Sequence, residues 1–300
     1  MGGIAFVFSG QGDQFPGMGK HWYERSTAAK AVFDELETVR PGTMAQCFDG
    51  TREELLQTAN TQPCLYAVEA AGAALLEARS IRAEAVAGFS LGEVAAAAVA
   101  GVFERKTGFE LVCKRGQLMQ RAAERQDTAM AAVVKLTAAR VTKLCREFDA
   151  VYPVNFNGPE QVAVAGNRGA IPAFFARVRE AGGRAIPLNV SGAFHSPFMR
   201  EAADGFAEIL REYTLREPEL RLYSDLTGDV YGDDPARLLA EQIANPVRWE
   251  TIVRRLIADG ITTFIEIGPG RTLGKLIQKL DADVSVLNVD DILEQIPEET

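Results

Sequence analysis

The stretch VAGFSLGEVAAAAVAGVF, residues 86–103, indicates how this chain folds. Residues 85–89 form a short apolar run that is typical of a buried strand, and the alanine-rich residues after Ser90 are typical of a helix. Ser90 stands between the two, flanked by Gly88 and Gly92. A serine in such a turn is either a nucleophile raised above the sheet or a helix-capping residue between glycines. The strand before it and the helix after it favour the nucleophile.

Strands and helices alternate on both sides of this stretch. Residues 4–8 form an apolar run that ends in the glycine-rich loop SGQGDQFPGMG. The segment TQPCLYAVEAAGAALLEARS predicts a helix with Pro63 in its first turn. Further strands are expected at LRLYSD, TTFIEIG and VSVLNV, and further helices at residues 248–259 and 271–280. This alternation predicts an α/β fold with a mainly parallel sheet.

Residues 128–190 interrupt the alternation. Their pattern predicts the order β-α-β-β-α-β, which is typical of a ferredoxin-like unit. We therefore expect a large domain at residues 1–126 and 192–300, and a small inserted domain at residues 127–191. The acidic end DDILEQIPEET is expected to be a solvated tail.

Composition excludes several classes of function. The 300 residues carry a net charge of −9, which argues against nucleic acid as a partner. No apolar run approaches the roughly 20 residues of a membrane span. The four cysteines lie far apart without a CxxC motif, as expected of reduced thiols rather than disulfides or a zinc site. Because the start MGGIAFVFSG also lacks signal-peptide features, we expect a cytoplasmic protein.

A serine nucleophile needs a base, and the chain has two histidines, His21 and His195. His21 lies among polar residues in GKHWYER and is expected at the surface. His195 follows the last strand of the small domain, in NVSGAFHSPFM, and is the better candidate for the base. No Asp or Glu between Ser90 and His195 clearly follows a strand of the large domain. We therefore expect another group, such as a backbone carbonyl, to orient the histidine.

Arg115 lies on the apolar face of a predicted helix, RKTGFELVCKRGQLMQRAAE. Its neighbours one turn away are Leu111, Val112, Leu118 and Met119. A charge on such a face is costly unless it is paired. The guanidinium could form a buried ion pair, extend along its aliphatic stem to solvent, or bind the carboxylate of a substrate. Spacing alone does not decide among these.

Eight ordered blocks, spread from about Phe8 to Ile277, resemble the malonyl-CoA:acyl carrier protein transacylases. These are the acyltransferases of fatty acid synthesis, related to the acyltransferase domains of polyketide synthases. The blocks are FSGQGDQFPGMG, TQPCLYAVEAA, GFSLGEVAAAAVAG, KRGQLMQ, VNFNGPEQVAVAG, GAFHSPFM, NPVRWE and EIGPGRTLGKLI. The resemblance implies an α/β-hydrolase-like catalytic domain with a ferredoxin-like insertion.

The resemblance also implies a role for each residue of the site. Ser90 would carry the malonyl group and His195 would be its base. Arg115 would bind the malonyl carboxylate. Gln11 and the backbone N–H of Leu91 would form the oxyanion hole.

Four further positions follow from the resemblance. Gln242 matches the residue whose backbone carbonyl orients the catalytic histidine, and Phe194 resembles the residue found in malonyl-selective members. Two positions depart from the family pattern: Phe89 replaces a histidine, and Ser9 replaces a proline. The first departure changes the hydrogen bonding expected around the turn, and the second is expected to have little effect on mechanism.

The function implied is a two-step malonyl transfer from malonyl-CoA to acyl carrier protein, without a metal or redox cofactor. Three alternatives remain open at this point. They are a discrete trans-acting acyltransferase of a polyketide synthase, a serine thioesterase on the same scaffold, and a non-catalytic module that binds carrier proteins or acyl-CoA.

Overall fold

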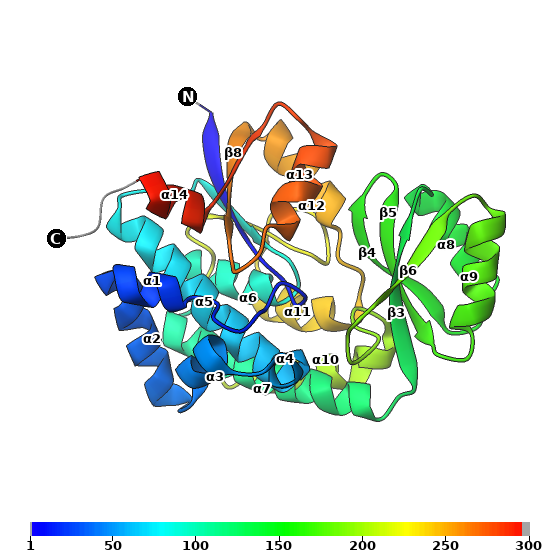
Figure 1. The fold of residues 1–300 in the computed structure, drawn as a ribbon, viewed down its shortest axis with the longest axis horizontal. Coiled ribbons are helices and arrows are strands. Elements are labelled where there is room, and N and C mark those ends of the chain that lie inside the picture. Colours follow the sequence, from blue (N-terminus) through cyan, green and yellow to red (C-terminus); the bar gives the residue numbers. More distant parts are fainter. Residues whose placement is uncertain (1, 296–300) are drawn as a thin grey trace.

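Two sheets organise residues 2–295, the part of the chain that the computed structural model describes (Figure 1). The larger sheet has five parallel strands in the order β7-β2-β1-β8-β9. Its strands are β1 (Gly3–Phe8), β2 (Ala85–Gly88), β7 (Arg221–Tyr223), β8 (Ile261–Ile267) and β9 (Ser285–Asn288). The predicted parallel α/β sheet is confirmed.

The central strands β1 and β2 of the large sheet are buried on both faces, which explains why they contain no polar side chains. Phe6 and Phe8 pack into a core with helices α2, α5, α6 and α7, whereas Ala5 and Val7 face a second core with α12 and α13. The helices of this part are α1 (Lys20–Arg25), α2 (Thr27–Val39), α3 (Thr43–Asp49), α4 (Arg52–Leu56), α5 (Thr58–Ala78), α6 (Leu91–Val99), α7 (Arg105–Glu124), α10 (Arg200–Leu210), α11 (Pro235–Glu241), α12 (Trp249–Ala258), α13 (Thr272–Leu280) and α14 (Val289–Gln295).

The second sheet is antiparallel, in the order β4-β5-β3-β6, and forms the green end of the molecule in Figure 1. Its elements are β3 (Thr128–Val134), α8 (Ala138–Cys145), β4 (Val151–Gly158), β5 (Gln161–Asn167), α9 (Ile171–Glu180) and β6 (Arg184–Leu188). This is the predicted ferredoxin-like order. The domain limits at residues 127 and 191 stay a prediction.

The small sheet contributes to two cores because its side chains alternate between faces. Ala131 and Val133 of β3 pack beneath α8 and α9, whereas Met130 joins the large core. Backbone hydrogen bonds from Phe156 N to Val247 O (2.9 Å) and from Val247 N to Val154 O (2.9 Å) tie β4 to the segment before α12. The inner face of the small sheet therefore lies over the large domain.

Pro63 lies in the interior of α5, so the prediction that it occupies the first turn was wrong. The helix begins five residues earlier, at Thr58. Proline removes one backbone hydrogen bond and crowds the preceding turn, at a cost of about 3 kcal/mol. Nearly the whole of α5 is buried, and this packing holds the additional turn in helical conformation.

The prediction of a solvated tail was wrong for its first residues. Asp290 and the residues after it form α14, in which Val289, Ile292 and Leu293 are buried. Their spacing of three and four residues gives the helix one apolar face. The indole N–H of Trp22 also donates a hydrogen bond to Asp290 Oδ1 (2.5 Å). Residues 296–300 of the predicted tail lie outside the described residues.

No helix within residues 2–295 has both the length and the apolar character needed to cross a membrane.

Candidate active site

Ser90 occupies a sharp turn between β2 and α6. Its backbone has φ 58° and ψ −101°, a strained conformation for a residue with a side chain. The flanking glycines allow the strand and the helix to approach closely. A Cβ on Gly88 would lie 1.9 Å from the carbonyl carbon of Gly92, and a Cβ on Gly92 would lie 2.3 Å from Phe8 O. The GFSLG motif is therefore required by backbone packing, and it leaves the Ser90 hydroxyl at the carboxyl end of the sheet.

His195 meets Ser90 from the segment that follows β6. Its Nε2 lies 2.8 Å from Ser90 Oγ, and its Nδ1 lies 2.8 Å from the carbonyl oxygen of Gln242. Since a carbonyl can only accept, Nδ1 carries the proton, and Nε2 is left to accept the Ser90 proton. The structure thus brings together the predicted nucleophile, the predicted base and a backbone carbonyl that orients the base.

The imidazole is held neutral. Burial, together with the nearby charge of Arg115, lowers the pKa of His195 to about 4. At neutral pH the ring can therefore take up a proton, as a general base must.

Arg115 is fully buried beside the nucleophile. Its Nη2 donates to Ser90 Oγ (3.2 Å) and to Gln242 Oε1 (3.2 Å), and its Nη1 donates to Gln62 Oε1 (2.8 Å). Arg115 Nε has no hydrogen-bond partner, and within residues 2–295 no carboxylate lies at ion-pair distance from this guanidinium. The structure thus rules out both the buried ion pair and extension to solvent.

The charge of Arg115 is retained despite burial. Burial lowers its pKa to about 10, while the neighbouring acids Glu93 and Asp225 act in the opposite direction. A buried cation that contacts only neutral groups is costly, and an anion that enters the site would relieve that cost. The site is therefore suited to a ligand with a carboxylate close to the reacting carbon.

A cavity of about 300 Å³ opens onto Ser90 and His195 between the two sheets. Its walls come from both parts of the chain and include Gln11, Leu91, Met130, Asn155, Leu188 and Phe194. This volume is at the lower end for ligand pockets and suits a small acyl group. A larger cavity of about 640 Å³, lined by α5, α6 and α7, contains none of the predicted site residues.

The remaining predicted residues line the same cavity. Gln11 Nε2 donates to Thr58 Oγ1 at 3.3 Å, which holds the amide at the cavity wall. Leu91 is the first residue of α6, where a helix leaves its backbone N–H without an intrahelical acceptor. Phe194 is buried at the wall of the cavity.

The two departures from the family pattern have local partners. Phe89 packs edge-on against Trp249, with ring centroids 5.7 Å apart, so an aromatic contact stands where the family pattern has a histidine. Ser9 donates a hydrogen bond to Glu69 Oε1 (2.8 Å), and burial raises the pKa of Glu69 well above its usual range.

Residue-by-residue reasoning overlooked several polar groups at the site. Gln62 and the side chain of Gln242 both accept hydrogen bonds from Arg115, and Gln242 Nε2 also donates to Ser90 O (2.9 Å). Asp225 accepts the backbone N–H of Ser90. Its position at the end of the predicted strand LRLYSD was the available signal, since the carboxyl ends of parallel strands carry such sites. No group of three His, Cys, Asp or Glu side chains within residues 2–295 is arranged to hold a metal ion.

Comparison with known proteins agrees with this geometry. A family model described as "Acyl transferase domain" matches residues 5–291. The malonyl CoA-acyl carrier protein transacylase of Bacillus subtilis (strain 168) is 38% identical over 97% of this chain and 94% of its own length. The crystal structure of malonyl CoA-acyl carrier protein transacylase from Clostridium perfringens Atcc 13124 superimposes with a TM-score of 0.94. It is 31% identical and covers 98% of this chain and 95% of its own.

A third match is a malonyl-transacylase solved in complex with a type II polyketide synthase acyl-carrier protein. Its TM-score is 0.93, at 31% identity, with 98% of this chain and 100% of that chain covered. The family resemblance seen in the sequence is confirmed, and this chain belongs to the acyl transferase family.

Proposed function

We propose that this chain transfers the malonyl group from malonyl-CoA to the phosphopantetheine thiol of acyl carrier protein through a malonyl-serine intermediate. The observation that carries the proposal is the buried, unpaired Arg115 guanidinium 3.2 Å from Ser90 Oγ. A guanidinium can donate two parallel hydrogen bonds to a carboxylate, so its place beside the nucleophile favours an acyl group that ends in a carboxylate. The relatives and neighbours described above are named for malonyl transfer to acyl carrier protein.

The first half-reaction acylates the enzyme. Neutral His195 takes the proton from Ser90 Oγ as the oxygen attacks the thioester carbon of malonyl-CoA. The backbone N–H of Leu91 and the side-chain amide of Gln11 donate hydrogen bonds to the oxyanion that forms. The tetrahedral intermediate then collapses, and the CoA thiolate leaves with the proton held by His195.

The second half-reaction transfers the malonyl group to the carrier. The phosphopantetheine thiol gives its proton to His195 and attacks the ester carbon of malonyl-Ser90. The serine oxygen leaves and recovers its proton from the imidazolium. The carbonyl of Gln242 holds the same ring nitrogen protonated throughout, so one histidine serves both steps. No metal or redox cofactor takes part in this proposed mechanism.

Two further assignments belong to the proposal. Phe194 limits the space beside the catalytic histidine and disfavours an acyl group with an α-methyl branch. The protein acts in the cytoplasm, which is supported by its four free cysteines, the usual state of thiols in a reducing compartment.

The function is tested by measuring whether the malonyl group is released to water or transferred to the carrier thiol. Malonyl-CoA is mixed with the enzyme with and without holo carrier protein, and free CoA, malonate and malonyl-carrier are measured. We expect malonyl-carrier to account for nearly all CoA released, and Ser90→Ala to produce none. Steady release of malonate that the carrier does not suppress would instead identify a thioesterase.

A further inference from the structure

The backbone N–H of the nucleophile has a carboxylate acceptor. Ser90 N lies 2.6 Å from Asp225 Oδ2, and both residues are buried. The hydrogen bond is charge-assisted, which makes it stronger than a bond between neutral groups. It acts on a residue whose strained φ of 58° persists only while surrounding structure holds it.

Asp225 interacts with a second buried acid. The buried carboxyl group of Glu93, on α6, interacts electrostatically with that of Asp225, and Tyr231 Oη donates a hydrogen bond to Glu93 Oε1 (2.5 Å). Two neighbouring carboxyl groups that are both buried resist ionising together. Burial and the charge of Asp225 keep the pKa of Glu93 well above its usual range. Burial also raises the pKa of Asp225, to about 7, while the hydrogen bond from the Ser90 N–H acts in the opposite direction. Of the two acids, Asp225 is therefore the one that ionises first.

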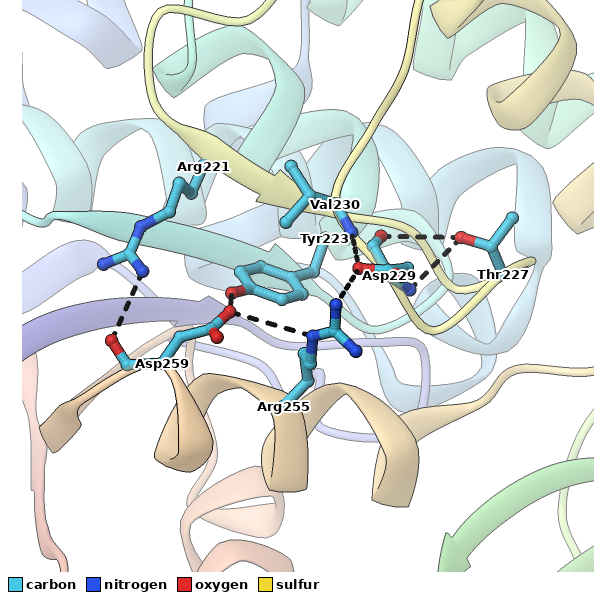
Figure 2. A network of polar contacts seen from close by, with 7 residues as sticks. All are labelled: Arg221, Tyr223, Thr227, Asp229, Val230, Arg255 and Asp259. Carbon is cyan, nitrogen blue, oxygen red and sulfur yellow. Dashed lines mark hydrogen bonds and ion pairs between the residues drawn. The ribbon is translucent and has the colours of Figure 1, made fainter.

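The segment that carries Asp225 is anchored from its outer side (Figure 2). Tyr223, the last residue of β7, donates through Oη to Asp259 Oδ2 (2.5 Å) on the adjacent turn after α12. Arg255 bridges Asp259 (3.9 Å) and Asp229 (3.3 Å), and its side chain points between them in Figure 2. The segment that carries Asp225 is therefore held in place by its contacts with α12 and the turn that follows it.

We propose that Asp225 is a positioning residue for the nucleophile. Its carboxylate fixes the Ser90 amide, turns Ser90 Oγ toward His195 Nε2 and leaves the Leu91 N–H free for the oxyanion. The inference rests on the proposed function, because it concerns the acylation of Ser90. It assigns a contribution to kcat rather than to substrate binding, since Asp225 contacts the backbone N–H of the nucleophile.

Single-turnover acylation by malonyl-CoA tests the inference in Asp225→Ala and Asp225→Asn. Asparagine keeps an oxygen for the Ser90 amide and presents its NH₂ to Glu93, whereas alanine removes the acceptor. We expect Asp225→Ala to slow acylation roughly 10- to 100-fold, as expected of a misplaced nucleophile, with KM unchanged. Asp225→Asn should remain within about threefold of the wild type because it keeps the hydrogen bond.

Tyr223→Phe is the matched control. It removes an anchoring hydrogen bond from the same segment without touching Ser90, so it should lower Tm but leave the acylation rate of folded protein unchanged. Equal rates in Asp225→Ala and Tyr223→Phe would overturn the inference, as would a loss in Asp225→Asn as large as that in Asp225→Ala. Failure of the wild type to acylate would instead contradict the proposed function.

A measurement on folded protein covers the case in which Asp225→Ala does not fold. A short hydrogen bond to a carboxylate should give the Ser90 amide a downfield proton shift and slow hydrogen exchange in the wild type. In Asp225→Asn the resonance should move upfield and still exchange slowly. Rapid exchange of this amide in the wild type, as at an open helix terminus, would overturn the inference.

Discussion

Replacing Arg115 by alanine should change which acyl group the enzyme prefers. Its guanidinium is fully buried and, among the residues that the structure describes, contacts only neutral acceptors, so a malonyl carboxylate would add an anionic contact. Removing one partner of a buried charge pair costs about 3–5 kcal/mol. At about 1.4 kcal/mol for each factor of ten, malonyl transfer should fall between roughly 100-fold and several thousand-fold.

Acetyl transfer should respond differently because acetyl has no carboxylate. Arg115 also donates to Ser90 Oγ, so its removal should reduce acetyl transfer by less than about tenfold. Arg115→Lys should lie between wild type and alanine for malonyl, because an ammonium cannot form two parallel hydrogen bonds with a carboxylate. The ratio of malonyl to acetyl kcat/KM should therefore fall in the order Arg, Lys, Ala.

The assay is CoA release from malonyl-CoA and from acetyl-CoA in the presence of holo carrier protein. Lys114→Ala is a matched control, since it removes a positive charge from the residue of α7 directly before Arg115. Lys114 contacts Tyr213 Oη (2.9 Å) at the surface and should leave both substrates unaffected. Equal losses for malonyl and acetyl in a folded Arg115→Ala would refute the reasoning and assign Arg115 a purely structural role.

Three other outcomes follow from buried groups of the site. Burial, and to a lesser degree the charge of Arg115, lower the pKa of His195 to about 4, so kcat/KM should be retained well below pH 6.5. Arg115→Gln removes that charge and should shift the acidic limb of the pH profile to higher pH. A wild-type acidic limb near pH 6.5 would contradict this. Phe194→Ser should raise methylmalonyl transfer relative to malonyl by roughly tenfold, within the 1–3 kcal/mol available from one methyl group; an unchanged ratio of kcat/KM values would show that Phe194 is not the gate. Burial raises the pKa of Glu69, so the folded state keeps a proton that the unfolded chain releases, and the free energy of unfolding falls as pH rises, by up to about 1.4 kcal/mol per pH unit. The Tm of Glu69→Gln, measured relative to that of the wild type, should therefore be higher at pH 8 than at pH 5. Tm curves that stay parallel across this range would contradict this.

Periodicity predicted the architecture because the two sheets impose clear patterns. The strand before Ser90, the helix after it and the order of the small domain are all local features, and each is confirmed. Pro63 and α14 were misjudged because packing against distant elements decided them. The helix preferences of proline and the charge of the acidic end carry no information on contacts with distant elements.

In the candidate site, too, the local features could be predicted and the contacts between distant segments could not. The roles of Ser90 and His195 could be inferred from motif context and from the scarcity of histidine. The surroundings of Arg115 could not be inferred, because the spacing of residues gives the face of its helix and does not say whether a carboxylate lies nearby. Asp225 was overlooked because its partner, the Ser90 amide, is 135 residues away in the chain.

The central claim is that Ser90 carries the malonyl group between two thiols. Intact-protein mass spectrometry tests it in two steps: incubation with malonyl-CoA, then addition of holo carrier protein. The account predicts that the wild type gains the mass of one malonyl group and loses it to the carrier, while Ser90→Ala gains nothing. An unchanged wild-type mass, or an adduct that persists in Ser90→Ala, would contradict it.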